Sequence, residues 1–161
     1  MTSVRVGQGF DVHRFSDEPD RALVLGGFLF DGERGLVGHS DADVVAHAVA
    51  DALLGAAGLA DIGQVFPESD PQFAGADSIE LLRQVAGMLA SRGWIAGNVD
   101  CSVVCERPNL AARRDDMERR LSDAVGAPVT VKGRRAEGLG ALGREEGIAC
   151  FAVAVIRQEG T

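Results

Sequence analysis

The chain of 161 residues is 46% hydrophobic and 25% charged, which predicts a globular protein with one domain, residues 1–161, around one sizeable core. Its formal net charge of −8 at pH 7 argues against a general binder of nucleic acids or anionic membranes, so we expect neither as a partner. The sequence shows no secretory leader pattern and no apolar run of about 18 residues, and we therefore expect a cytoplasmic protein without a membrane span.

Residues 4–10 interleave hydrophobic residues with glycines and predict a first strand, and Asp11 and His13 follow it. Because an extended chain repeats every two residues, these two side chains point to the same side. A carboxylate and an imidazole so placed can hold one divalent ion. The pair alone is also typical of an ordinary surface loop, so a metal site needs further ligands.

A second strand is expected over 22–30, where the glycines at 26–27 permit a turn or a bulge. A charged, glycine-rich loop then leads to a helix. We expect this helix to be capped by Ser40 or Asp41 and to end near Ala57. It is strongly apolar apart from a few polar positions.

Three of those polar positions, Asp43, His47 and Asp51, recur every four residues and so form one stripe on the helix. A lone histidine on an apolar helix is usually a hydrogen-bonded core residue. Carboxylates one turn away on either side are instead typical of a metal-bound imidazole with outer acceptors. We therefore predict that Asp11, His13 and His47 form a three-ligand site, with an open position for catalysis on a zinc-like ion.

The stretch 61–75 contains two prolines and short polar residues, which predicts an ordered loop without regular structure. Residues 77–80 carry a capping-box pattern and open a helix that should end near Arg92, before Gly93. A strand is expected over 98–105.

The rest of the chain predicts a charged helix over 110–125, a short strand over 129–132, a glycine-rich basic loop over 133–144 and a last strand over 147–156. The last strand has no polar alternation, so both of its faces should be covered. If the helices cover one face, a second subunit must cover the other. We therefore expect a homo-oligomer packed through its sheets.

Nine of the sixteen Lys and Arg residues lie between Arg107 and Arg144. Arg134, Arg135 and Arg144 belong to the glycine-rich loop, where backbone N–H and guanidinium groups can bind phosphate. A metal site together with such a loop indicates phosphoryl chemistry. Spacing alone does not name the substrate.

The three cysteines, Cys101, Cys105 and Cys150, lie in apolar runs, and we expect buried, reduced thiols. Cys101 and Cys105 lie four residues apart on an expected strand, too far apart to pair with each other. A Cys-x-x-x-Cys metal site is the alternative, but the sequence offers no second half for it.

Several short motifs follow one another along the chain. They are Gly9–His13, Gly38–Asp43 with His47, Asp61–Gly63 followed by Phe66 and Pro67, Gly75–Ser78, and Gly143–Ala149. Together they resemble the motifs of 2-C-methyl-D-erythritol 2,4-cyclodiphosphate synthases, and the resemblance covers nearly the whole chain, from 7 to 155. It implies a single α/β (α+β) domain with a mixed β-sheet, helices on one face, and sheets packed around the axis of a homotrimer.

The resemblance also implies a reaction of non-mevalonate isoprenoid synthesis. The substrate would be a cytidine diphosphate compound, 4-diphosphocytidyl-2-C-methyl-D-erythritol 2-phosphate, whose 2-phosphate attacks the β-phosphorus. The products would be 2-C-methyl-D-erythritol 2,4-cyclodiphosphate and CMP, and the active sites would lie between adjacent subunits. Two alternatives are open: a catalytically impaired trimer that binds metal and nucleotide, and a metal-dependent phosphohydrolase.

By the same resemblance, zinc would bind Asp11, His13 and His47, and magnesium or manganese would bind between the substrate phosphates near Glu137. His39 and Arg135 would stabilise the transition state. The substrate-binding residues would be Asp11, His13, His39, Ser40, Asp61, Ile62, Gly63, Phe66, Ser69, Asp70, Cys105, Arg107, Pro108, Asn109, Leu110, Arg134, Arg135, Ala136, Glu137, Ala141 and Arg144.

The chain departs from the family pattern at three places. The run Arg134-Arg135-Ala136 replaces a threonine-rich run, Asn109 replaces a usual lysine, and Ala141 replaces a usual phenylalanine. An arginine at 135 can stabilise phosphate by its charge, but its length demands a different geometry. Because the three predicted metal ligands are all present, we expect an active enzyme.

Overall fold

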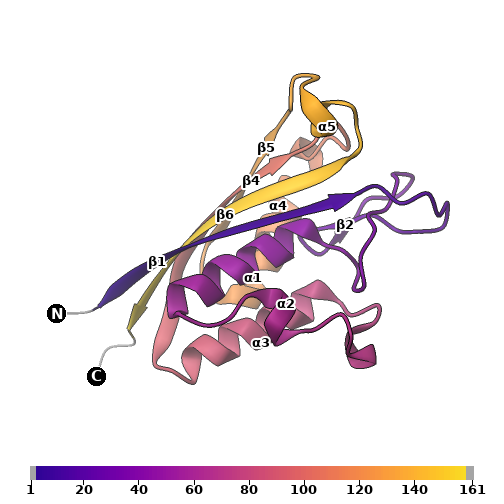
Figure 1. The fold of residues 1–161 in the computed structure, drawn as a ribbon. Helices are drawn as coiled ribbons and strands as arrows, with labels where there is room; N and C mark the ends of the chain where they lie inside the picture. Colours follow the sequence, from indigo (N-terminus) through magenta and orange to yellow (C-terminus); the bar gives the residue numbers. More distant parts are fainter. Residues whose placement is uncertain (1–2, 159–161) are drawn as a thin grey trace.

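Four strands form a mixed sheet in the spatial order β1-β6-β4-β5 in the computed structural model, which describes residues 3–158 (Figure 1). They are β1 (Val4–Arg14), β4 (Trp94–Val104), β5 (Val129–Arg134) and β6 (Gly147–Gln158). β6 pairs antiparallel with both β1 and β4, and β4 pairs parallel with β5. The expected α+β domain with a mixed sheet is confirmed.

Helices α1 (Val44–Ala57), α3 (Ser78–Ala90) and α4 (Arg114–Val125) cover one face of this sheet (Figure 1). α1 packs on β1 and β6, α3 packs on α1 and β4, and α4 packs on β5. The short elements are β2 (Val24–Leu25), β3 (Phe28–Leu29), α2 (Ile62–Val65), α5 (Gly140–Gly143) and the 3-10 turns η1 (Pro71–Phe73) and η2 (Ala111–Arg113). Among residues 3–158, no helix is long and apolar enough to cross a membrane.

α1 lies so close to β1 that two glycines of the strand touch the helix backbone. A Cβ atom at Gly7 would lie 2.0 Å from the carbonyl oxygen of Ala52, and one at Gly9 would lie 2.0 Å from that of Ala48. The helix presents alanines here, so no long side chain separates the two elements. The inward positions of β1 that follow Gly9 therefore reach the first turn of α1.

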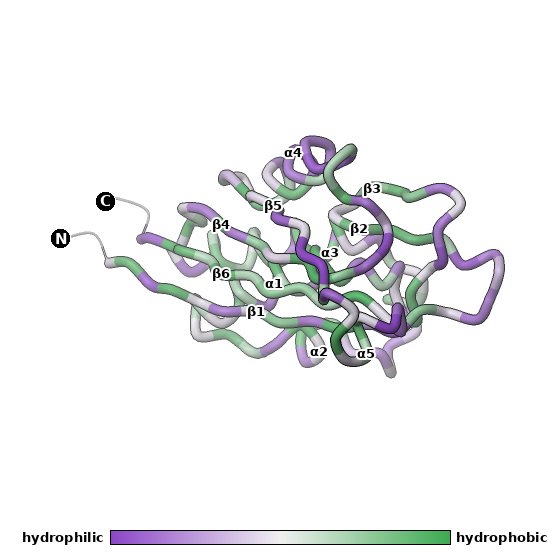
Figure 2. Tube along the Cα trace, turned by 90° about the horizontal axis from the view of Figure 1, so that it is seen from above, coloured by the Kyte–Doolittle hydropathy of each residue, from purple (hydrophilic) through white to green (hydrophobic). Residues whose placement is uncertain are grey.

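The other face of the sheet carries hydrophobic side chains that this chain leaves exposed. Those that are 45–65% exposed on β1 and β6 are Val4, Val6, Phe10, Val12, Phe151 and Val153. Phe10 and Phe151 lie in contact across the two strands, with ring centroids 4.8 Å apart. Figure 2 colours much of β1 and β6 as hydrophobic. Within one chain, therefore, only one face of the last strand is covered.

Helix α1 is capped by Asp43, and the prediction of a cap at Ser40 or Asp41 was wrong. The buried Asp43 carboxylate accepts hydrogen bonds from two N–H groups in the first turn of α1 and from two in the 26–27 turn between β2 and β3. One side chain thus satisfies four backbone donors, whereas Asp41 accepts from the N–H groups of Asp43 and Ser78 instead. Burial raises the pKa of Asp43 to about 6, the charge of Asp41 adds to this shift, and hydrogen bonds from backbone N–H groups oppose it.

Several boundaries in the first half differ from those predicted. β1 continues to Arg14 and includes Asp11 and His13, because its pairing with β6 continues that far. The strand expected over 22–30 is the β2–β3 hairpin, with its turn at 26–27, where both glycines have positive φ. The stretch 61–75 contains α2 and η1, each begun by an aspartate cap, so the prediction of no regular structure there was wrong.

In the second half the predicted elements are present, with shifted ends. α3 is capped by Asp77 and ends at Ala90 rather than near Arg92. β4 begins four residues earlier than predicted, at Trp94. The basic loop expected over 133–144 is shorter than predicted, because β5 continues to Arg134 and α5 occupies Gly140–Gly143. All three cysteines are free and buried, as expected.

Gly9→Ala should destabilise the fold, because its Cβ would meet the backbone of α1 with no flexible side chain able to move away. We expect a loss of about 1–3 kcal/mol in the free energy of unfolding, measured by urea denaturation. Gly87→Ala in α3 is the matched control, because a Cβ there meets no atom within 4 Å. The control should gain about 0.5–1 kcal/mol from helix propensity. A Gly9→Ala variant as stable as the parent would contradict the close packing.

Candidate functional site

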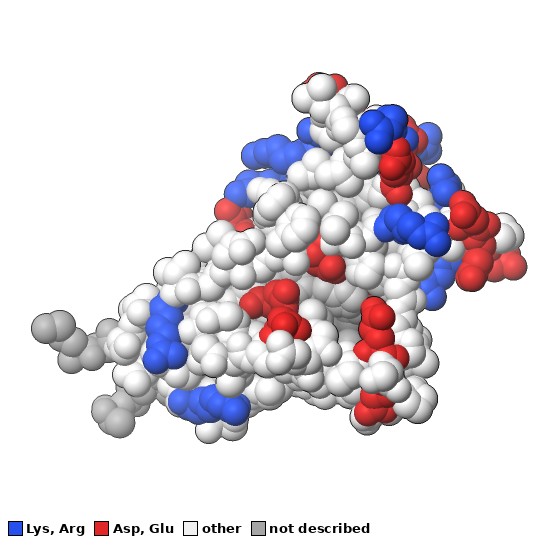
Figure 3. All heavy atoms as spheres, viewed as in Figure 1, with Lys and Arg blue, Asp and Glu red and all other residues white. Residues whose placement is uncertain are grey.

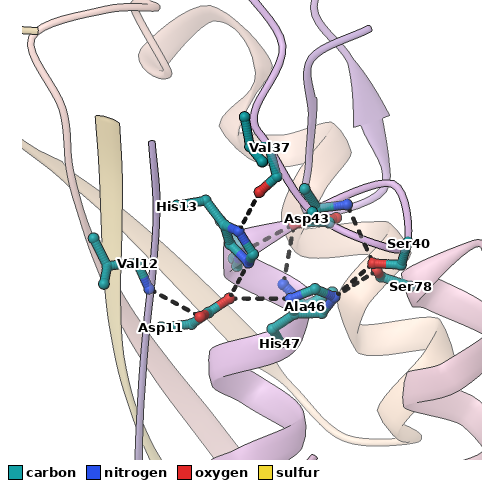
Figure 4. A network of polar contacts seen from close by, with 12 residues as sticks. Asp11, Val12, His13, Val37, Ser40, Asp43, Ala46, His47 and Ser78 are labelled. Carbon is teal, nitrogen blue, oxygen red and sulfur yellow. Dashed lines mark hydrogen bonds and ion pairs between the residues drawn. The ribbon is translucent and has the colours of Figure 1, made fainter. Parts of the chain in front are cut away.

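Asp11, His13 and His47 converge at the point where β1 passes the start of α1. Asp11 Oδ2 lies 3.0 Å from His13 Nε2 and 3.0 Å from His47 Nδ1 (Figure 4). One ligand atom from each of the three residues lies within 4.8 Å of the others. Two imidazole nitrogens and one carboxylate oxygen form a donor set that suits zinc and leaves a fourth position open. The predicted convergence is confirmed, and the group could bind a metal ion.

The charges of the three residues reinforce one another. Burial raises the pKa of Asp11, but hydrogen bonds from His13 and His47 outweigh it and hold the pKa well below its usual range. Burial lowers the pKa of His13, but the hydrogen bond and the charge of Asp11 outweigh it and raise the pKa above its usual value. Asp11 is therefore an ionised carboxylate that can bind a cation. At His13, a proton competes with a metal ion for the imidazole.

The remote nitrogen of each imidazole is also hydrogen-bonded. His13 Nδ1 donates to the carbonyl oxygen of Val37 at 2.6 Å. His47 Nε2 lies 2.9 Å from Ser78 Oγ and 3.2 Å from Ser40 Oγ (Figure 4). These contacts orient both rings and leave His13 Nε2 and His47 Nδ1 facing Asp11.

The prediction that Asp43 and Asp51 accept from His47 was wrong. Asp43 caps the helix, and Asp51 accepts from the backbone N–H of Ile62 at 2.8 Å. Both carboxylates satisfy backbone donors at the starts of helices, which would otherwise lack partners. The outer partner of His47 comes instead from Ser78, in the first turn of α3.

A pocket of about 150 Å³ opens beside the three candidate ligands. The residues that line it are Asp11, His13, His39, Ser40, His47, Ile62, Gly63, Phe66, Glu68, Phe73 and Leu81. Of these, Glu68 belongs to the stretch 66–70 that the resemblance placed along the pocket. Sequence reasoning missed Phe73 and Leu81, because periodicity says nothing about which parts of a loop turn inward. Figure 3 shows acidic side chains around a hollow in the middle of this face, with Lys and Arg toward its edges.

Three of the predicted substrate-binding residues near this pocket do not line it. Asp61 is exposed, and its carboxylate caps α2 by accepting from Gln64 N at 2.9 Å. Asp70 contributes its carbonyl oxygen, which lies 3.3 Å from His39 Nε2. Ser69 is exposed and is not among the lining residues.

Arg21 holds the loop that carries His39 and Ser40, and sequence reasoning missed it. Its guanidinium donates to the carbonyl oxygens of Leu36 at 3.0 Å, Gly38 at 3.1 Å and Ser40 at 2.6 Å. Three carbonyl groups converging on one cation set the path of a loop that has no regular structure. A single arginine in a polar loop carries no spacing signal that could have revealed this role.

A second pocket, of about 300 Å³, lies between the end of β4 and β5. The residues that line it are Cys105, Glu106, Pro108, Asn109, Leu110, Ala111, Arg114, Val131, Lys132, Gly133, Arg134 and Arg135. Arg135 donates to the carbonyl oxygen of Glu106 at 2.8 Å and lies 3.5 Å from its carboxylate. Four cations against one carboxylate make this pocket suitable for an anion. The two pockets share no lining residue.

The remaining predicted residues lie outside both linings. Arg107 forms an ion pair with Glu33 at 3.5 Å, and Arg144 donates to Glu146 at 2.6 Å. Glu137 adopts a left-handed backbone conformation with φ of 54°, which is sparsely populated by residues other than glycine. Ala136 precedes Glu137 in the chain, and Ala141 lies four residues beyond it in α5.

Comparisons with known proteins agree on one family. The YgbB family matches residues 4–157. The 2-C-methyl-D-erythritol 2,4-cyclodiphosphate synthase of Thermosynechococcus vestitus is 51% identical over 160 residues, which cover 98% of this chain and 98% of that protein.

Solved structures show the same fold. The bifunctional IspDF from Campylobacter jejuni has a TM-score of 0.93 at 35% identity, and the match covers 99% of this chain and 43% of that chain. IspF from Plasmodium falciparum, in a complex with CDP, has a TM-score of 0.85 at 30% identity, and the match covers 99% of both chains.

Zinc binding should require His47 and should weaken as the pH falls. Because the pKa of His13 is raised, a proton occupies it at higher pH than in a free histidine, and metal must displace that proton. Below this pKa we expect zinc affinity to fall about tenfold per pH unit for each proton displaced, measured by competition with a chromophoric chelator.

His47→Ala should abolish high-affinity binding. His39→Ala is the matched control, since His39 lines the same pocket outside the ligand group. Full zinc retention in His47→Ala would refute the assignment.

Proposed function

This chain belongs to the YgbB family, and on that premise we propose that it is a 2-C-methyl-D-erythritol 2,4-cyclodiphosphate synthase. It would convert 4-diphosphocytidyl-2-C-methyl-D-erythritol 2-phosphate to 2-C-methyl-D-erythritol 2,4-cyclodiphosphate and CMP. The observation that carries the proposal is the convergence of Asp11, His13 and His47 at a pocket that also holds His39 and Ser40.

The reaction brings two anionic groups of one molecule together, the 2-phosphate and the diphosphate. Asp11, His13 and His47 would hold a zinc ion, which when bound offsets the repulsion between the phosphates and polarises the attacked phosphorus. His39 and Ser40 stand at the same pocket, where they would donate hydrogen bonds to phosphate oxygens. Arg21 would keep their loop in place through its three carbonyl contacts.

The methylerythritol part would lie against Ile62, Gly63 and Phe66, which form the apolar side of the 150 Å³ pocket. Asp61, Ser69 and Asp70 lie outside that lining. Asp61 and Asp70 would act mainly by shaping the loop, through the cap of α2 and the contact to His39.

The cytidine diphosphate part would occupy the 300 Å³ pocket between Cys105 and Leu110 on one side and Arg134 and Arg135 on the other. Its excess of cations suits the diphosphate. Glu137 would bind a magnesium or manganese ion between the phosphates, with Arg107, Ala136, Ala141 and Arg144 near the same end. The CDP complex of the Plasmodium falciparum relative supports a nucleotide site in this fold.

A homotrimer would complete the site. The two pockets have separate linings within one chain, which is expected if the metal group of one subunit meets the nucleotide pocket of the next. The hydrophobic side chains on the open face of β1 and β6 would be buried between subunits around the trimer axis. The cytoplasmic location stays a prediction.

The reaction is tested by its products. Incubation of the purified chain with the proposed substrate, zinc and magnesium should yield CMP and the cyclic diphosphate, identified by phosphorus NMR. A linear, water-attacked product would favour the phosphohydrolase alternative. Absence of CMP release, with nucleotide still bound, would favour the impaired binding protein.

A substitution at Arg135 distinguishes the active-enzyme hypothesis from the hypothesis of an impaired binding protein. If its guanidinium stabilises the transferring phosphates, Arg135→Ala should lower kcat by about 10²-fold while KM changes much less. Arg83→Ala, an exposed arginine of α3 that pairs with Glu80, is the control and should keep the parent kcat. An unchanged kcat in Arg135→Ala would show that the family's threonine role has no counterpart here.

A further inference from the structure

Asp41 and Ser78 belong to the sequence motifs but have no part in the proposed reaction. They lie behind His47, on the side away from Asp11. Ser78 Oγ lies 2.9 Å from His47 Nε2, and it also donates to the Asp41 carboxylate. Ser78 is 1% exposed, so its hydroxyl is shielded from bulk solvent. The three side chains therefore form a hydrogen-bonded chain from a carboxylate to a metal-ligating imidazole.

The direction of this chain follows from the chemistry of its ends. An ionised carboxylate only accepts hydrogen bonds, and a hydroxyl has a single proton. Because Ser78 gives its proton to Asp41, it can only accept from His47. The 2.9 Å contact therefore places a hydrogen on Nε2. Nδ1, which hydrogen-bonds to the Asp11 carboxylate at 3.0 Å, is then the nitrogen that would give up its hydrogen to bind metal.

The backbone holds this arrangement in place. Asp41 accepts a second hydrogen bond from the backbone N–H of Ser78 at 3.0 Å and a third from that of Asp43 at 3.2 Å. The N–H of Asp41 donates to the carbonyl oxygen of Ala76 at 3.1 Å. The loop before α1 and the loop before α3 are thus joined at the residue that directs the serine hydroxyl.

Ser40 does not reverse this direction. Its Oγ accepts from the N–H of Ala42 at 3.2 Å and lies 3.2 Å from His47 Nε2, which is compatible with a shared hydrogen from that nitrogen. His13 shows the same principle in a simpler form. The carbonyl oxygen of Val37 can only accept, so it keeps the hydrogen on His13 Nδ1 and leaves Nε2 for the metal.

We propose that Asp41, acting through Ser78, is a positioning residue that fixes His47 in the Nε2–H form and so reserves Nδ1 for the metal ion. Outer partners of metal-bound histidines typically change metal affinity by about 10- to 100-fold. The inference rests on the proposed metal site, and it assigns a role to the aspartate of the Gly38–Asp43 motif and to the serine of the Gly75–Ser78 motif.

The test is the zinc affinity of four variants, measured with a chromophoric competitor. Ser78→Ala removes the acceptor and should weaken binding about tenfold. Asp41→Ala leaves a hydroxyl free to donate to Nε2 and should weaken binding more, by about 10- to 100-fold. The double variant should match Ser78→Ala within about twofold, because Asp41 acts through the serine. Asp77→Ala is the control: it removes the cap of the same helix and should keep the parent affinity.

Two results would overturn the proposal that Asp41 acts on His47 through Ser78. One is an Asp41→Ala variant that binds zinc like the parent or like the Asp77→Ala control. The other is a double variant whose loss equals the product of the two single losses, which would mean independent structural effects.

A spectroscopic measurement on the unaltered protein covers the case in which a variant does not fold. In the zinc-loaded chain, nitrogen NMR of His47 should show metal on Nδ1 and a hydrogen on Nε2. Metal on Nε2 would contradict the proposal that Asp41 and Ser78 keep a hydrogen on that nitrogen. If the unaltered protein takes up no zinc at all, the proposed metal centre fails instead, so the two failures are distinguishable.

Discussion

The close approach of helix α1 to strand β1 is the constraint on which the site depends. Gly7 and Gly9 let the strand backbone touch the helix, with no Cβ to hold the elements apart. The alternation of the strand then carries Asp11 and His13 to the same side, beside the first turn of the helix, where His47 stands. Packed backbone rather than flexible loop therefore keeps the three ligand atoms within 4.8 Å of one another.

One buried aspartate, Asp43, and two half-buried ones, Asp41 and Asp51, connect helix α1 to the neighbouring loops. Asp43 joins α1 to the β2–β3 turn, Asp41 joins the same region to α3, and Asp51 joins α1 to α2. In each case the carboxylate accepts backbone N–H groups at the start of a helix, which stabilises the negative charge and leaves the loop little freedom. Part of the net charge of −8 therefore holds the fold together and is not a solvated surface.

Spacing and ligand chemistry together predicted that Asp11, His13 and His47 would come together, as they do. Asp11 and His13 share a strand face, and His47 stands one turn into a helix, so local geometry and ligand chemistry pointed to the same three residues. The stripe that included Asp43 and Asp51 misled for the same reason, since periodicity places side chains on a face without showing which backbone groups compete for them. The roles of Ser78 and Arg21 depend on contacts with segments distant in sequence, which no spacing encodes. The roles of the nucleotide and magnesium residues came from resemblance and stay predictions.

The Arg135–Glu106 pair decides what the substituted loop can do. Arg135 is largely exposed but Glu106 is mostly buried, and the 3.5 Å between Nη1 and the Glu106 carboxylate makes this ion pair a long one. A diphosphate carries more charge than one carboxylate and offers oxygens to both guanidinium nitrogens. The arginine can therefore leave Glu106 for the substrate, or keep Nη1 on the Glu106 carbonyl and reach with Nη2. A threonine has neither option, because it must be placed by the backbone alone. If position 135 contacts phosphate as the resemblance implies, the arginine would replace a short, fixed donor with a longer charged one whose position is set by Glu106.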